Sequence, residues 1–109
     1  MKANATTCPA EFTLAMIGGR WKIPIIFHLL AGRRRFSELA RSLTGVTQKM
    51  LTQQLREMER NGLVTRNIYP QVPPKVEYSL TELGASLQPV VEAMCRWGEL
   101  HGDVSEVGR

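Results

Sequence analysis

Cysteine is scarce in this chain, and long hydrophobic runs are missing from it. Two cysteines among 109 residues, Cys8 and Cys95, are too few and too far apart for a disulfide framework. No apolar run approaches the roughly 18–20 residues that span a bilayer. The first residues, MKANATTCPAEF, lack the apolar stretch of a secretory signal. We therefore expect a cytoplasmic protein that does not contact membranes.

The residue patterns of catalytic and metal sites are missing as well. The acidic residues occur singly or on solvated faces of predicted helices, and no Gly-rich phosphate loop follows a strand. His28 and His101 do not fall at metal-ligand spacing with either cysteine. We expect a protein that is not an enzyme and that holds no metal and no cofactor.

The composition predicts one folded domain, 1–109, with an uneven charge. Hydrophobic residues make up 43% and charged residues 22%, which favours a packed core over disorder. Residues 1–80 hold twelve Lys and Arg against five acids, and residues 81–109 hold two against five. A basic body favours an anionic partner such as nucleic acid.

The stretch 44–60 is the most informative segment of the chain. Thr47 can cap a helix, and apolar residues then recur at helical spacing at Leu51, Leu55 and Met58. The opposite face carries long hydrogen-bond donors without acids, namely Lys49, Gln53, Arg56 and Arg60, with Thr52 at its flank. Such donors suit phosphates and base edges. Any surface helix can carry similar side chains, so the flanking segments decide the interpretation.

The flanking segments complete a winged helix-turn-helix. A short helix from Phe36, with Ser37 as its expected cap, and a turn at Thr44-Gly45 precede the long helix, giving a motif over 36–61. Alternating segments at 63–69 and 75–80, joined through prolines, predict a hairpin that forms a wing over 62–80. We expect a mainly α fold with this small β-hairpin, an N-terminal arm over 1–7, N-terminal helices over 8–31 and a tail over 102–109.

A last helix, capped by Thr81 and running to about His101, is expected to form the dimer interface. Its apolar residues Leu83, Leu87, Val90, Met94 and Trp97 follow the 4-3-4-3 spacing of helix-on-helix seams, and we expect a kink at Pro89. The predicted interface comprises Phe12, Val90, Val91, Met94, Trp97 and Leu100. A lone chain would expose this stripe to water.

Several phrases of the sequence resemble the HxlR-type transcriptional regulators, relatives of the MarR group. They are Cys8-Pro9, Gly19-Arg20-Trp21-Lys22, Arg34-Arg35-Phe36-Ser37-Glu38-Leu39, Lys49-Met50-Leu51-Thr52, Leu55-Arg56-Glu57-Met58-Glu59, Gly62-Leu63-Val64, Pro73-Pro74-Lys75-Val76-Glu77-Tyr78-Ser79-Leu80-Thr81, Gly84 and Trp97-Gly98. They span roughly residues 8–98. The resemblance implies a homodimer that binds inverted-repeat operator DNA. It also implies, in some members, redox or electrophile sensing by the N-terminal cysteine.

The predicted DNA-binding residues lie on three segments. The run Arg33–Arg35 precedes the motif and is expected beside the DNA backbone, although it could instead be a solvated loop. The wing offers Arg66, Gln71 and Lys75 for phosphates or the minor groove, although its prolines could simply stiffen the hairpin. The full set is Arg33, Arg34, Arg35, Ser37, Thr47, Gln48, Lys49, Thr52, Gln53, Arg56, Arg66, Gln71 and Lys75.

Cys8 is the candidate redox-sensing residue. Pro9 suits the first position of a helix, which places the Cys8 thiol near unpaired amides and the positive end of the helix dipole. Both favour the reactive thiolate, and Glu11, one turn on, opposes it. The alternative is an ordinary buried and inert cysteine. Cys95, beside the apolar seam, is interpreted as a packing residue.

The sequence thus predicts a DNA-binding transcriptional regulator that acts as a homodimer, and two alternatives remain open. One is a winged-helix module that docks proteins, which would not need an acid-free basic helix face. The other is a regulator controlled by a small-molecule effector bound between the N-terminal helices and the last helix. DNA binding would weaken steeply with salt, which separates it from protein docking.

Overall fold

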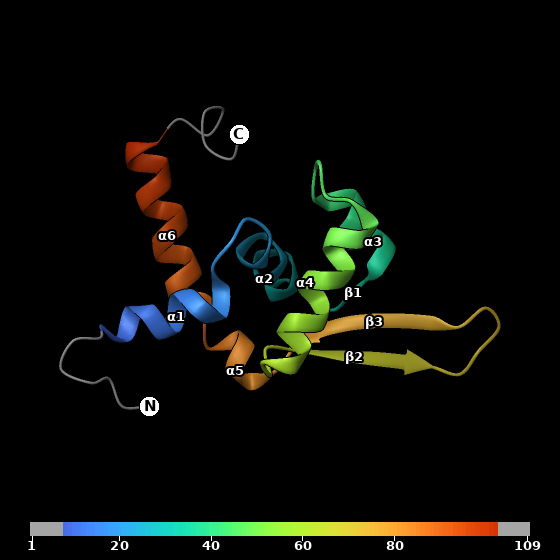
Figure 1. Cartoon of the computed structure of the whole chain (residues 1–109). Helices are drawn as coiled ribbons and strands as arrows, with labels where there is room; N and C mark the ends of the chain where they lie inside the picture. Colours follow the sequence, from blue (N-terminus) through green and yellow to red (C-terminus); the bar gives the residue numbers. More distant parts are fainter. Residues whose placement is uncertain (1–7, 103–109) are drawn as a thin grey trace.

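A computed structural model describes residues 8–102 of the chain. The expected N-terminal arm over 1–7, and the expected tail except for Gly102, lie outside the described residues. The elements, in chain order, are α1 (Pro9–Ile17), α2 (Lys22–Leu30), β1 (Arg34–Arg35), α3 (Phe36–Ser42), α4 (Gln48–Arg60), β2 (Val64–Tyr69), β3 (Lys75–Leu80), α5 (Glu82–Ala85) and α6 (Gln88–His101). The mainly α fold with a small antiparallel sheet confirms the predicted winged helix-turn-helix (Figure 1).

The N-terminal helices begin and end where the sequence places them. Cys8 is the N-cap residue of α1 in an extended conformation, and Pro9 occupies the first helical position, where its missing N–H costs nothing. Gly18 ends α1, and Gly19 follows with a φ of 94° that favours glycine. α2 then starts at Lys22.

The helix-turn-helix motif forms with one change at its start. The Thr47 hydroxyl oxygen accepts a hydrogen bond from the Met50 backbone N–H at 3.0 Å, which caps α4 as predicted. α3, however, begins at Phe36, so the prediction that Ser37 caps it is wrong. Arg35 holds the cap position, and its backbone N–H donates to Glu38 Oε1 at 2.7 Å. The Glu38 carboxylate therefore satisfies a backbone donor at this helix start.

Within residues 8–102 the sheet has three strands in the order β1-β3-β2, all antiparallel. The wing hairpin pairs Val64 with Leu80 at its base and Tyr69 with Lys75 toward its tip. β1, which the sequence did not predict, places Arg34 opposite Tyr78 and Arg35 opposite Glu77. Two residues are too short to show the alternation that indicates a strand. The arginine run is therefore partly a strand and not a solvated loop.

The predicted last helix is two helices. Thr81 caps the short α5 by accepting a hydrogen bond from the Gly84 backbone N–H at 3.0 Å, and the chain turns at 86–87 before α6 begins. Pro89 explains the break, because it has no N–H to offer the Ala85 carbonyl in a continuous helix. A new helix from Gln88 places Pro89 in its first turn, where no donor is needed. The expected kink inside one helix is thus replaced by a break before Pro89.

The core lies where α2, α3, α4 and the sheet meet. Its buried apolar residues are Ile17, Ile25, Ile26, Leu29, Leu39, Leu43, Leu51, Leu55, Met58, Leu63, Val64, Tyr78 and Val91. Val91 anchors α6 to this core and is fully buried within the chain. Its assignment to a dimer interface is therefore wrong, because no second copy can reach it.

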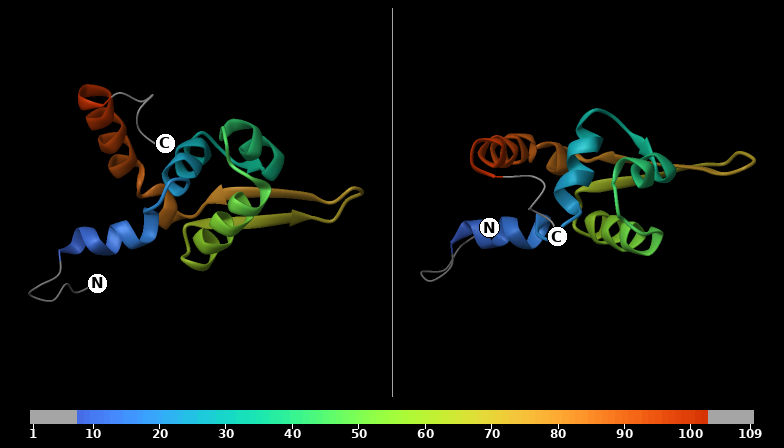
Figure 2. Two further views of the ribbon diagram at one scale, coloured as in Figure 1. Left: turned by 45° about the horizontal axis from the view of Figure 1, so that its top comes forward. Right: turned by 90° about the horizontal axis from the view of Figure 1, so that it is seen from above.

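The wing projects away from α1 and α6, which lie at the opposite end of the molecule (Figures 1 and 2). α4 lies beside β2, between these two ends. The DNA-binding residues predicted from the sequence and the predicted dimer interface thus occupy separate regions. No helix within residues 8–102 combines the length and the apolar character that a membrane crossing requires.

Candidate nucleic-acid interface

The outer face of α4 forms a shallow open depression of about 810 Å³. The inner face packs Leu51, Leu55 and Met58 into the core, which fixes the rotation of the helix about its axis. The residues that line the depression are Gln48, Lys49, Thr52, Gln53, Arg56, Glu57 and Arg60. The basic face therefore lies where the sequence predicts it, and a row of hydrogen-bond donors faces solvent.

Glu57 is the residue at this face that the sequence interpretation missed. Its carboxylate lines the same depression, so the face is not free of acids. Glu57 Oε1 accepts a hydrogen bond from Lys22 Nζ at 2.8 Å. This hydrogen bond and the Lys22 charge hold the pKa of Glu57 below its ordinary value, with a smaller contribution from the Arg60 charge and some opposition from burial.

The position of Lys22 in the sequence could have indicated that this lysine has an anionic partner. It opens a helix that is otherwise apolar apart from His28, and its side chain is only 9% exposed. A lysine in such a position needs an anionic partner. The sequence alone could not identify Glu57 as that partner, because the two residues are 35 positions apart.

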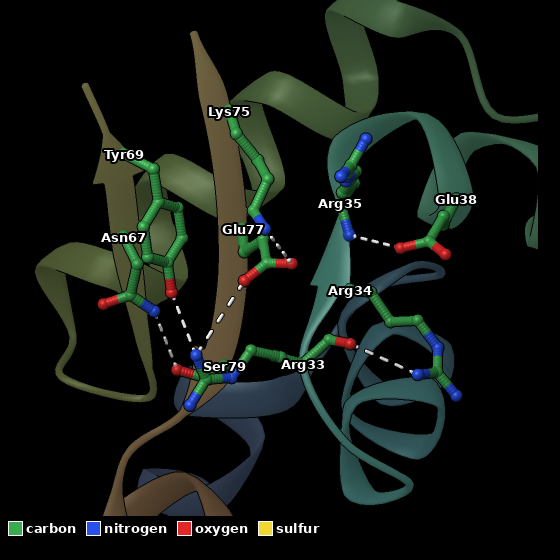
Figure 3. A network of polar contacts seen from close by, with 9 residues as sticks. All are labelled: Arg33, Arg34, Arg35, Glu38, Asn67, Tyr69, Lys75, Glu77 and Ser79. Atoms are coloured by element: carbon green, nitrogen blue, oxygen red, sulfur yellow. Dashed lines mark hydrogen bonds and ion pairs between the residues drawn. The ribbon is translucent and has the colours of Figure 1, made fainter. Parts of the chain in front are cut away.

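The run Arg33–Arg35 meets the wing in a network of polar contacts (Figure 3). Arg33 Nη1 donates to the Tyr69 hydroxyl at 2.9 Å and lies 3.9 Å from Glu77 Oε1. Lys75 Nζ lies 3.7 Å from Glu77 Oε2 and 4.8 Å from the centre of the Tyr69 ring. Glu77 is thus shared by two cations, of which Arg33 links the wing to the segment before α3.

Four predicted DNA-binding residues come together between α3 and the wing tip. Arg35, Ser37, Gln71 and Lys75 line a depression of about 490 Å³ at this junction. Arg34 turns elsewhere, since its Nη1 donates to the Arg33 carbonyl oxygen at 3.2 Å. The structure therefore brings together residues of the arginine run, of the helix-turn-helix motif and of the wing.

Arg66 ties the wing to the end of α4. Its Nε lies 3.7 Å from Glu59 Oε1, and both side chains are about half exposed. An exposed ion pair of this kind contributes little to stability. Arg66 therefore remains open to an anionic partner, with its charge partly offset by Glu59.

Both cysteines, Cys8 and Cys95, are exposed. Cys8 lies at the start of α1, as predicted, and its side chain caps no backbone amide. Cys95 lines an open depression with Phe27 of α2 and Arg96 of α6, so the interpretation of Cys95 as a packing residue is wrong within this chain. Residues 8–102 contain no cluster of three His, Cys, Asp or Glu side chains suited to a metal ion.

α1 and α6 lie at the end of the molecule away from the wing (Figure 2), and both carry exposed apolar side chains. Their exposed large apolar residues are Phe12, Leu14, Val90, Met94, Trp97 and Leu100. Trp97 is 67% exposed and contacts only the His101 ring among aromatic groups of the described chain. Five of the six predicted interface residues are thus exposed on these two helices, and Leu14 is exposed beside them.

Comparison with known proteins identifies relatives over nearly the whole chain. The model of the HxlR-like helix-turn-helix family matches residues 16–106. The chain is 53% identical to the uncharacterized HTH-type transcriptional regulator YybR of Bacillus subtilis, over 94% of this chain and 82% of that protein. It superposes on the redox regulator HypR in its reduced form with a TM-score of 0.84 at 54% identity, covering 91% of this chain and 98% of that one. For the reduced form of the B. subtilis transcriptional regulator YodB, the TM-score is 0.76 at 38% identity, covering 90% and 100%.

Proposed function

The chain belongs to the HxlR-like helix-turn-helix family of transcriptional regulators, which are not enzymes, and we propose that it binds operator DNA sequence-specifically as a homodimer. In this proposal 36–61 contacts the major groove, 62–80 contacts the adjacent backbone or minor groove, and α1 and α6 form the dimer. The observation that carries it is the outer face of α4, where Lys49, Gln53 and Arg56 face solvent beside the wing. Arg and Gln side chains make bidentate hydrogen bonds to guanine and adenine edges.

Selection of bound sequences from a random DNA pool tests this proposal. We expect enrichment of an inverted repeat whose half-site centres lie about 34–36 Å apart, one turn of DNA. Affinity should fall steeply as salt rises, because phosphate contacts release counterions. A pool that yields no enriched sequence, together with salt-independent capture of a protein partner, would favour the protein-docking alternative.

The homodimer is supported by the exposed apolar surface of α1 and α6. Phe12, Val90, Met94, Trp97 and Leu100 would all leave water if a second copy packed there. A two-fold axis at this end would also set two α4 helices apart on one DNA face. Light scattering at micromolar concentration should give the mass of a dimer, and a monomer mass would contradict this part of the proposal.

Redox or electrophile response through Cys8 is the finer part of the proposal. The relative HypR is described as a redox regulator, and Cys8 is exposed at the start of α1, a helix that the proposal places in the dimer interface. Diamide would take two electrons and two protons from Cys8 and a second thiol, which then join in a disulfide. An electrophilic quinone would instead form a sulfur–carbon bond with Cys8 alone. Either product would alter the packing of α1 and hence the setting of the two halves.

The test measures operator affinity before and after diamide or a quinone. We expect the native chain to lose affinity and the variant Cys8→Ser to keep it. The variant Cys95→Ser shows whether Cys95 supplies the second thiol, since it should then resist diamide while remaining sensitive to the quinone. An unchanged native affinity after both reagents would overturn the switch while leaving DNA binding intact.

A small-molecule effector is the second candidate, favoured by one cavity. A mostly apolar hollow of about 470 Å³ lies between α1 and α6, and Leu14, Ile23, Val90 and Met94 are among its lining residues. A volume in this range suits a small ligand. Aromatic effectors that raise the melting temperature and shift operator affinity would support it. If no effector changes the melting temperature or the operator affinity, the hollow is better explained as part of the dimer interface.

A further inference from the structure

A partly buried ion pair joins α2 to the outer side of α4. Lys22 is the first residue of α2 and is buried, and its Nζ lies 2.8 Å from Glu57 Oε1. A cation is unfavourable at a helix N-terminus, and burial of a charge is unfavourable too. The burial of the Lys22 charge therefore depends on Glu57, because the core around Lys22 is otherwise apolar.

Glu57 occupies an unusual place for an acid. It is the carboxylate among the residues that line the outer depression of α4, next to Arg56 and one turn from Gln53 and Arg60. A negative charge there would repel the phosphates that this surface is proposed to approach. Its side chain is one-third exposed, so solvent alone would not remove this repulsion.

We propose that Lys22 is a positioning residue for DNA recognition, which acts through Glu57. Its ammonium draws the Glu57 carboxylate toward the core and neutralises it, so that Glu57 does not offset part of the positive charge of Lys49, Arg56 and Arg60 on the outer face of α4. This inference rests on the proposed DNA-binding function. The pair also links the start of α2, which directly follows the turn after α1, to the last turn of α4.

The proposal differs from a purely structural role in what it expects of Glu57. If the pair only stabilised the fold, loss of either partner would weaken DNA binding. If Lys22 neutralises Glu57, loss of Lys22 should weaken binding, and removal of the Glu57 charge should restore it. The two roles thus give opposite results for Glu57→Gln.

The experiment measures the affinity of the dimer for the selected operator duplex and for a random duplex of equal length, by fluorescence anisotropy over a range of salt. The variants are Lys22→Met, Glu57→Gln and the double variant. Arg96→Met is the matched control, because it removes one positive charge from the exposed face of α6, away from α4. Circular dichroism and a thermal melt establish that each variant is folded.

We expect Lys22→Met to weaken binding to both duplexes by about three- to tenfold, the effect of one uncompensated charge a few ångströms from phosphates. Its salt slope should fall by about one. Glu57→Gln should bind at least as tightly as the native chain, and the double variant should lie within about twofold of Glu57→Gln.

Three results would overturn the inference. They are equal affinities for Lys22→Met and Arg96→Met, a double variant as weak as Lys22→Met, and a Glu57→Gln variant that binds more weakly than the native chain. The last of these needs no substitution at Lys22, so it decides the matter even if Lys22→Met does not fold. A native chain that binds neither duplex would instead contradict the proposed function, and the inference with it.

Discussion

At the scale of single residues, some of the positively charged side chains lie in ion pairs within the chain and others face solvent. Arg33, Lys75 and Arg66 each lie near a carboxylate of the wing or of α4. Lys49 and Arg56 on α4 have no ion pair within residues 8–102. The helical period predicted the second group well, because spacing alone decides which side of α4 faces outward. Partners such as Lys22 and Glu57 depend on tertiary contacts, which no local pattern encodes.

The first residue-scale prediction concerns base contacts. Replacing Gln53 or Arg56 by Ala should cost about 1–3 kcal/mol of operator binding and relax the preference at one base pair. Lys75→Ala, in the depression between α3 and the wing tip, should instead weaken all sequences alike and flatten the salt slope. Anisotropy with the operator and with single-base variants measures both effects. If the double variant Gln53→Ala/Arg56→Ala keeps the native affinity, α4 does not contact the bases.

The second residue-scale prediction concerns how the stability of the fold depends on pH. Because the folded-state pKa of Glu57 lies below its ordinary value of 4.5, the folded state favours the charged carboxylate. The pair's contribution to stability is therefore present above pH 4.5 and is lost as pH falls through the lowered pKa. Thermal melts from pH 7 to pH 3 should show a smaller acid-induced loss for Glu57→Gln than for the native chain. Identical losses would mean that the pair does not contribute to stability.

At the scale of elements, the long and regular segments were predictable and the short ones were not. α4 and both wing strands lie within a residue of their predicted bounds, since each carries a clear period and a capping or turn residue. β1 has only two residues, and its pairing with β3 depends on contacts more than forty positions away along the chain. The break between α5 and α6 was mistaken for a kink, because the apolar spacing continues through it while the backbone does not.

A prediction at this scale concerns the start of α4. Thr47→Ala should lower the free energy of unfolding by about 0.5–2 kcal/mol, because the Met50 N–H loses its 3.0 Å acceptor. Thr44→Ala, in the exposed turn just before it, is the matched control and should change stability by less than about 0.5 kcal/mol. Urea denaturation compares the two. Equal effects would show that the Thr47 cap is not what stabilises this helix start.

At the scale of the whole molecule, the wing and the apolar surface lie at opposite ends, with α4 between them. The sequence predicted both ends, because one is marked by prolines between alternating segments and the other by an apolar stripe. It could not show that Val91 turns inward while Val90 and Met94 stay exposed. Which valine faces inward depends on how α6 packs against α2. That packing follows from the break between α5 and α6.

The prediction at this scale concerns dimer formation. Trp97→Lys should raise the dimer dissociation constant at least about tenfold, because it places a charge within a surface that is expected to lose water. Phe27→Lys is the matched control, since Phe27 is also an exposed aromatic residue but lies across α6 from the apolar hollow. Sedimentation of both variants over a concentration series measures the effect. If the Phe27 variant dissociates and the Trp97 variant does not, the interface lies on the other face.

Two short turns flank residues 22–85, the central part of the chain, and they have a mechanical consequence. α1 joins that part through residues 18–21, and α6 joins it through residues 86–87. α6 is also held at a second place, because its buried Val91 packs into the core and α6 contacts α2, so it cannot swivel freely about residues 86–87. Torque applied at one end should therefore reach α4 with little loss. Such stiffness would make the regulator intolerant of operators whose half-sites are one base pair too close or too far apart.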